Sequence, residues 1–160
     1  MKNTRPINHA VYWMRLLAIC ALVAFTGTLH ATGSINVSPA SGLALHGYDP
    51  VAYFVNGEPR RGDDVFRYEY QDVIWRFSNA ANKQAFIESP ESYLPQYGGF
   101  CAYAASKNAL ADIDPAAWTI HDDKLYLNYS LNVRRRWRAD RDLNIRAADK
   151  FWPELAKQVK

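Results

Sequence analysis

The residue of this sequence best suited to chemistry is Cys101, in the stretch YLPQYGGFCAYAAS. A thiolate is a soft metal ligand and also a nucleophile. Gly98 and Gly99 come shortly before it, and glycine can adopt positive φ in turns whose amide N–H groups favour an anion. Cysteine is also a small residue that packs well in a core. The sequence therefore leaves three roles open for Cys101: metal ligand, nucleophile or buried packing residue.

Residues 1–33 are typical of a secretory signal peptide. Within them an apolar run over 16–25 follows a basic residue and precedes small and polar residues. The run is shorter than the roughly 20 residues of a comfortable membrane span, so an uncleaved anchor is the lesser alternative. We expect cleavage after Ala31 or Gly33. The mature protein is then periplasmic or secreted, with no membrane insertion.

Removal of this segment changes the counts of cysteine and of charge. Cys20 is lost, so Cys101 becomes the only cysteine and no internal disulfide can form. The segment also carries three of the 19 basic residues and no acidic one, which leaves 16 basic and 16 acidic residues. A neutral domain gives no reason to expect nucleic acid as a partner. The basic run at 134–138 is interpreted as a helix surface neutralised by nearby aspartates, namely Asp140, Asp142 and Asp149.

Three further side chains are candidate partners of the thiol. His46 and His121 are the only histidines that remain after cleavage, and Asp49 lies three residues beyond His46. Imidazole with thiolate suits copper or zinc, and a carboxylate could complete or orient the set. The alternatives are histidines that are simply exposed near turns, and an aspartate that starts a turn before Pro50.

Two hairpins should supply the strands that position these residues. In the segment 65–78, a turn at Gln71 and Asp72 would pair Tyr70 with Val73 and place Arg67 opposite Arg76, with solvent or an acidic neighbour beside the arginines. The same register also predicts the aromatic pairs Tyr68 with Trp75 and Phe66 with Phe77. In the segment 118–128, a turn at Asp122 and Asp123 would place apolar residues on one side, namely Trp118, Ile120, Leu125 and Leu127.

Helical patterns lie between and after the hairpins. The segment 78–89 has Ser78 or Asn79 as its N-cap and stops before Pro90, and its apolar face is expected to consist of Ala81, Ala85 and Phe86. The tail 131–157 predicts two helices, or one broken near Asp140, with Pro153 allowing a further break. We expect an α+β fold, a small antiparallel sheet of hairpins packed by several short helices, in one domain over 43–158 after a flexible lead-in at 34–42.

Three motifs resemble the YHS domain family in its exported bacterial branch: GYDPVAYF, WRFSNAANKQAFIESPESYLPQYGGFCAYA and DKLYLNYS. The resemblance implies a small metal-associated module. The chain departs from the family pattern at three positions where cysteine is usual, which are Ala52, Ser78 and Ala81. Some exported relatives have selenocysteine at the position of Cys101, which implies a chemically active residue there.

The function expected from these observations is an exported, non-enzymatic module that binds copper or zinc through Cys101, with His46, His121 and Asp49 as further ligands. One alternative is a redox enzyme or redox partner that uses the thiol with a histidine as base. Another is a metal-independent module that binds a periplasmic protein or a small ligand, with a pocket lined by tyrosines such as Tyr48, Tyr53, Tyr97 and Tyr103.

Overall fold

The computed structural model describes residues 34–159. The signal peptide expected over 1–33, and with it the prediction of export, lies outside these residues. In the part that is described, no helix is both long enough and apolar enough to cross a membrane. The elements, in chain order, are η1 (Leu45–Gly47), α2 (Ala52–Val55), β1 (Asp63–Tyr70), β2 (Val73–Phe77), α3 (Ala80–Glu88), η2 (Pro90–Ser92), η3 (Gln96–Gly99), α4 (Ala102–Ala105), β3 (Asp114–His121), β4 (Lys124–Asn128), α5 (Leu131–Ala139) and α6 (Arg141–Ala156).

The first hairpin, β1 with β2, turns at Gln71 and Asp72 as predicted. Tyr70 lies opposite Val73, and Arg67 lies opposite Arg76. The acidic neighbour expected beside the two arginines is Asp64, whose Oδ1 lies 2.8 Å from Nη2 of Arg76 and 3.8 Å from Nη1 of Arg67. The carboxylate therefore relieves the repulsion between the two guanidinium groups.

The register beyond this point differs from the prediction. Tyr68 does face Trp75, but the expected pair of Phe66 with Phe77 was wrong, because Phe77 lies opposite Asp63. A bulge between Asp63 and Arg67 puts extra residues in β1. Such a bulge bends the strand locally, and strict alternation of side chains cannot reveal it.

The second hairpin, β3 with β4, turns at Asp122 and Asp123 as predicted, and the four apolar residues expected on one side pair with one another. Trp118 pairs with Leu127, and Ile120 pairs with Leu125. Asp122 and Asp123 both have positive φ, as a two-residue hairpin turn requires. The two hairpins form two separate two-stranded sheets, and the α+β class is confirmed.

The helices begin and end where their local signals indicate. Asn79 caps α3, because its side chain accepts a hydrogen bond of 2.8 Å from the backbone N–H of Asn82. Ala81, expected on the apolar face, is exposed, and Asn82 occupies the buried position instead. The C-terminal helices separate at Asp140, while α6 continues through Pro153.

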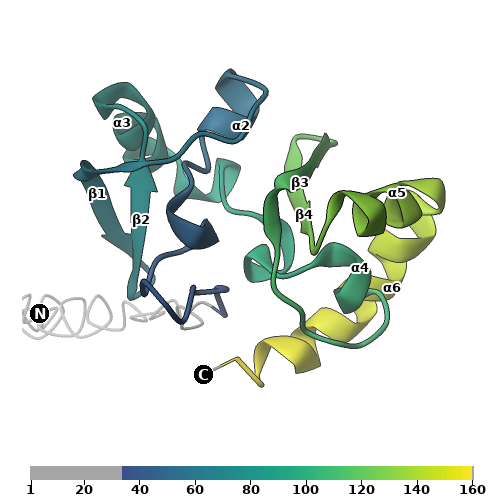
Figure 1. Cartoon of the computed structure of the whole chain (residues 1–160). Coiled ribbons are helices and arrows are strands. Elements are labelled where there is room, and N and C mark those ends of the chain that lie inside the picture. The colour runs from purple at the N-terminus through teal and green to yellow at the C-terminus, as the bar shows by residue number, and fades with distance from the viewer. Residues whose placement is uncertain (1–33, 160) are drawn as a thin grey trace, which may run out of the picture.

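Two groups of buried residues form the core. The larger one surrounds Phe86, whose ring lies 5.3 Å from that of Trp75 and 5.2 Å from that of Phe77. It also includes Leu125 and Leu127 of β4, so both hairpins share one core. The smaller group lies between the second hairpin and the C-terminal helices, and consists of Tyr97, Ala102, Ala105, Tyr126, Trp137, Ala148 and Leu155. Figure 1 shows β1, β2 and α3 on one side of the molecule and β3, β4, α5 and α6 on the other.

The N-terminal residues of the described part lie against the fold. Ile35 and Asn36 are buried. The Asn36 N–H donates a hydrogen bond of 2.7 Å to the Gly98 carbonyl, and Ser34 Oγ donates one of 2.6 Å to the carbonyl of Ala156. The start of the segment 34–42, for which the sequence suggested a flexible lead-in, is thus held by both η3 and α6.

Candidate functional site

Cys101 lies in the core at the start of α4, with 1% of its surface exposed. It is the N-cap of this short helix, and its Sγ accepts a hydrogen bond of 3.4 Å from the Ala104 N–H. The thiol donates at 3.8 Å to Oδ1 of Asn128. Its backbone N–H bonds to the carbonyl of Ala111. The thiol and the backbone N–H of Cys101 therefore both form hydrogen bonds inside the protein.

Asn128 is the polar side chain that accepts the hydrogen bond of the thiol. It is fully buried, and its Oδ1 also accepts from the Tyr103 N–H at 3.2 Å. Its Nδ2 has no hydrogen-bond partner among the residues that the structure describes. Buried amide donors are rarely left unpaired, because an unpaired donor costs free energy of folding. The compensating contribution of Asn128 is its Oδ1, which accepts hydrogen bonds from the Cys101 thiol and the Tyr103 N–H at the start of α4.

The two histidines are half-buried, and each has an acidic partner of its own. Nε2 of His46 is 2.8 Å from Oδ1 of Asp112. Nε2 of His121 is 3.3 Å from Oδ2 of Asp122 and 3.8 Å from Oδ1 of Asp142. Neither imidazole shares a hydrogen bond with Cys101.

Asp49 is buried, and its carboxylate is occupied by hydrogen bonds from the chain itself. The residue is 0% exposed. Its Oδ1 accepts from the backbone N–H groups of Val51 and Ala52. Its Oδ2 accepts from the N–H and hydroxyl of Ser78 and from the side-chain amide of Asn82. Five donors thus converge on one carboxylate, which joins the DPV turn to the start of α3.

The structure does not bring the four predicted metal ligands into one cluster. No hydrogen bond or ion pair joins any two of them within residues 34–159, and no group of three or more His, Cys, Asp or Glu side chains in this range could hold a metal ion. The arrangement does not fit a copper or zinc centre built from these residues, and such a centre would require them to move. Metal binding stays a prediction.

Cys101 should react slowly with alkylating reagents in the native protein. Because the thiol is buried and hydrogen-bonded, reagent reaches it only when the surrounding core opens. We expect iodoacetamide to modify Cys101 at least about 100-fold more slowly than in guanidinium chloride, which corresponds to an opening free energy of about 3 kcal/mol. Mass spectrometry of the peptide that contains Cys101 gives the rate. A native rate close to the denatured one would instead support the reactive-thiol alternative.

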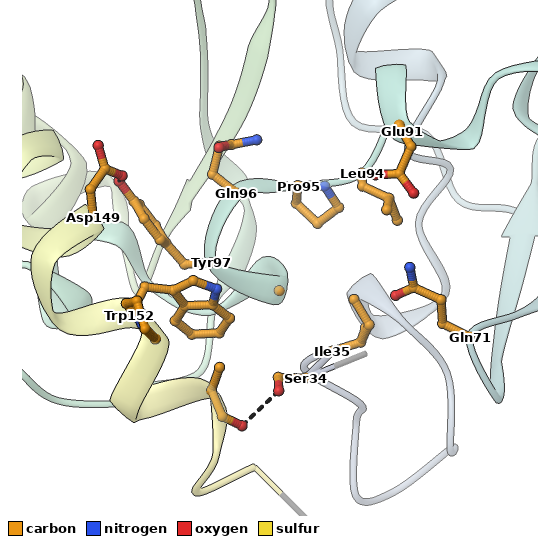
Figure 2. Close-up of a pocket in the computed structure, with 13 residues that line it drawn as sticks. Ser34, Ile35, Gln71, Glu91, Leu94, Pro95, Gln96, Tyr97, Asp149 and Trp152 are labelled. Carbon is orange, nitrogen blue, oxygen red and sulfur yellow. Dashed lines mark hydrogen bonds between the residues drawn. The ribbon is translucent and has the colours of Figure 1, made fainter. Parts of the chain in front are cut away.

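A concave site lies elsewhere, between the N-terminal described residues, η3 and α6. It is an open pocket of about 450 Å³. Figure 2 shows the ring of Trp152 on one side and Pro95, Leu94 and Ile35 on the other. The lining residues come from segments far apart in the sequence, and are Ser34, Ile35, Gln71, Glu91, Leu94, Pro95, Gln96, Tyr97, Gly98, Asp149, Trp152, Pro153 and Ala156.

The floor of this pocket depends on a close backbone approach at Gly98. Gly98 has a φ of +59°, and a Cβ placed on it would lie 1.8 Å from the carbonyl oxygen of Ser34. Only glycine accepts both the left-handed conformation and this contact. Tyr97 and Gly99 beside it also have positive φ. Of the glycine pair singled out in the sequence, Gly98 thus serves the pocket by letting the backbone of Ser34 lie against η3, while a Cβ on Gly99 would meet Leu45 and Pro95 instead.

One wall of the pocket is fixed by a phenol and a carboxylate. The hydroxyl of Tyr97 donates a hydrogen bond of 2.9 Å to Oδ1 of Asp149. Burial, and then this hydrogen bond, raise the pKa of Tyr97 well above its usual value. The phenol therefore stays protonated and holds the carboxylate at the rim. The ring of Tyr97 lies edge-on to Trp152, with centroids 5.9 Å apart.

The sequence identified part of this site. Tyr97 was among the tyrosines proposed to line a ligand pocket, and it does so. Tyr53 is instead buried in the core, and the Tyr48 and Tyr103 rings lie under Arg61 and Lys107 respectively. Trp152, which lines the pocket, was not among the predicted site residues. Its only signal was an aromatic residue next to a proline in the last helix.

The arginine run in α5 is not neutralised as expected. Asp142 pairs with Arg141, and Asp149 bonds to Tyr97, so both carboxylates have other partners. Among the described residues, no ion pair involves any of the four arginines, which are Arg134, Arg135, Arg136 and Arg138.

Asp112 links the N-terminal residues to the body of the domain in a pH-dependent manner. Partial burial would raise the pKa of this carboxyl, but hydrogen bonds from Asn36, from the Ile113 N–H and from His46 outweigh burial and hold the pKa below its usual value. The stabilisation is therefore complete above the unfolded pKa of about 3.9 and is lost as the pH falls through the lower, folded value. Asp112→Asn should therefore lower the free energy of unfolding at pH 6, and the loss should be smaller at pH 3. Urea titration at the two pH values measures both losses. A difference that grows on acidification contradicts this assignment.

Comparisons of the chain with protein-family models, with curated proteins and with solved structures gave no match.

Proposed function

We propose that the protein is a metal-independent binding module that takes a small organic ligand in the pocket between the N-terminal residues, η3 and α6. The pocket itself carries the proposal. Its volume of about 450 Å³ lies within the range of small-molecule sites, which is about 300 to 1,000 Å³. An apolar wall with a few polar groups at the rim is the usual composition of such sites.

The lining favours binding over catalysis. It contains no thiol or imidazole, because Cys101, His46 and His121 all lie outside it. Its one serine, Ser34, donates its hydroxyl proton to the Ala156 carbonyl rather than to a base. A nucleophile needs a base within hydrogen-bond reach. The one lining hydroxyl that bonds to a carboxylate is that of Tyr97, on Asp149, and its raised pKa keeps this phenol protonated. Export to the periplasm or the cell exterior, expected from the sequence, remains part of the proposal.

A screen of small aromatic and heteroaromatic compounds tests this function. We expect binders at millimolar concentration to shift the ¹H–¹⁵N signals of Gly98, Gln96 and the Trp152 indole. Trp152→Ala should abolish the shifts, and Trp152→Phe, which keeps a ring against Tyr97, should retain part of the affinity. Leu143→Ala is the matched control, since Leu143 lies in the same helix but is 61% exposed and outside the pocket. Binders that map only to other surfaces would refute the proposal.

The metal-binding expectation has its own test. Protein treated with a chelator is titrated with Cu(I) or Zn(II), in parallel with Cys101→Ser. If the parent protein binds about one equivalent and the variant does not, the metal module is supported against the present proposal. We expect no difference between the two, because the thiol is buried and its hydrogen-bond partners within residues 34–159 are the Asn128 amide oxygen and the Ala104 N–H, neither of them an imidazole or a carboxylate.

A further inference from the structure

We infer that the ligand of this pocket is a small organic cation that carries an apolar or aromatic group, an inference that rests on the function proposed above. The charge of the lining is the first observation. Glu91 and Asp149 belong to it, and none of the lining residues is Lys, Arg or His. A pocket lined by one sign of charge concentrates ligands of the opposite sign.

The two carboxylates retain capacity for a ligand. Each has one hydrogen bond from a phenol of the chain: Tyr70 donates to Glu91 at 2.8 Å, and Tyr97 donates to Asp149 at 2.9 Å. A carboxylate has about four acceptor sites. Within residues 34–159 neither Glu91 nor Asp149 forms an ion pair. Figure 2 shows them at opposite ends of the pocket, so an ammonium group can meet a carboxylate at either end.

The aromatic wall is the second observation. Elsewhere on the protein, aromatic rings face cations of the chain itself: Arg61 lies 5.2 Å from the ring centre of Tyr48, and Lys107 lies 5.0 Å from that of Tyr103. No cation of the described chain lies over Trp152. An indole face attracts a cation within about 6 Å of its centre. The rings of Tyr97 and Phe100 pack against Trp152 with centroids 5.9 and 6.3 Å away, and the part of the indole that lines the pocket is the part an external ammonium group can approach. The apolar side chains of Ile35 and Leu94 accept the rest of the ligand.

Three probes of similar size and different charge test the inference: phenethylamine, 2-phenylethanol and phenylacetate. Titration of the purified protein, followed by ¹H–¹⁵N NMR, gives the dissociation constant of each. We expect phenethylamine to bind at least about fivefold more tightly than 2-phenylethanol, because it adds a carboxylate contact and a cation–π contact at a partly exposed site. Phenylacetate should bind the weakest, and added salt should reduce the preference for the amine.

Charge-neutralising variants identify the carboxylates responsible. The double variant Glu91→Gln with Asp149→Asn keeps acceptors for both phenols and should bring the amine and the alcohol within about twofold of each other. Glu154→Gln is the matched control, because Glu154 lies in α6 outside the lining and pairs with Lys157. If 2-phenylethanol or phenylacetate binds the pocket as tightly as phenethylamine does, the preference for a cation is overturned while the proposed binding function stands. If no probe shifts the pocket signals, both are overturned.

Discussion

Asp49→Ala lowers the free energy of unfolding by at least about 3 kcal/mol, or prevents folding altogether. The substitution leaves five donors without their acceptor, three of them backbone N–H groups at Val51, Ala52 and Ser78. Each buried donor left unpaired costs about 1 to 3 kcal/mol. A domain of this size is stable by about 5 to 15 kcal/mol, so the loss is a large part of the total. Urea unfolding followed by circular dichroism measures it.

The isosteric variant and a surface control separate hydrogen bonding from side-chain volume. Asp49→Asn keeps the shape but directs an amide NH₂ at donors, so it should also destabilise by about 2 kcal/mol or more. Asp72→Asn is the control, because Asp72 is exposed in the first hairpin turn at a φ of 60°, a conformation that asparagine tolerates. It should change stability by less than about 0.5 kcal/mol. If Asp49→Asn is as mild as the control, the carboxylate does not organise the loop.

Gly98→Ala lowers the free energy of unfolding by about 2 to 4 kcal/mol and weakens ligand binding in the pocket. The new methyl group imposes strain at positive φ and displaces the Ser34 carbonyl, which lies 1.8 Å from the Cβ position. Residues 34–36 must then move away from η3. Hydrogen exchange provides a local measure, since the amide of Asn36 loses its bond to the Gly98 carbonyl and should exchange faster.

Gly57→Ala is the matched control for this prediction. Gly57 has a similar φ of +66°, but a Cβ there meets no atom within 4 Å. It therefore shows the conformational strain alone, which is about 1 kcal/mol. The Asn36 amide should be unaffected in this variant. Equal losses of stability from the two substitutions would show that the contact between Gly98 and Ser34 contributes nothing.

Most elements of the fold follow from signals that act over a few residues. Asn79 caps α3 with its own side chain, and the Asp122–Asp123 pair forms a turn that sets the register of its hairpin. The bulge between Asp63 and Arg67 was missed because no local residue demands it. At the far side of the bulge Phe77 is buried and its partner Asp63 is exposed, so the pair does not continue the aromatic face.

The candidate site was harder to predict because it depends on packing between distant segments. Cys101, His46 and Asp49 were chosen for their chemistry, and each has hydrogen-bond partners within the fold that their residue types do not disclose. The pocket combines Ser34, Tyr97 and Trp152, which have no common motif. The glycine pair before Cys101 did mark a special backbone conformation, but the close approach that Gly98 permits is to the backbone of Ser34, not to the thiol.

The most direct test of the account is a titration of chelator-treated protein with phenethylamine, followed through the indole N–H signals. Binding in the pocket without metal predicts a saturable shift of the Trp152 signal, together with Gly98. Trp75 and Trp137, which are fully buried away from the pocket, should stay in place. A Trp152 signal that does not move, or that moves only after Cu(I) or Zn(II) is added, would contradict metal-independent binding in this pocket.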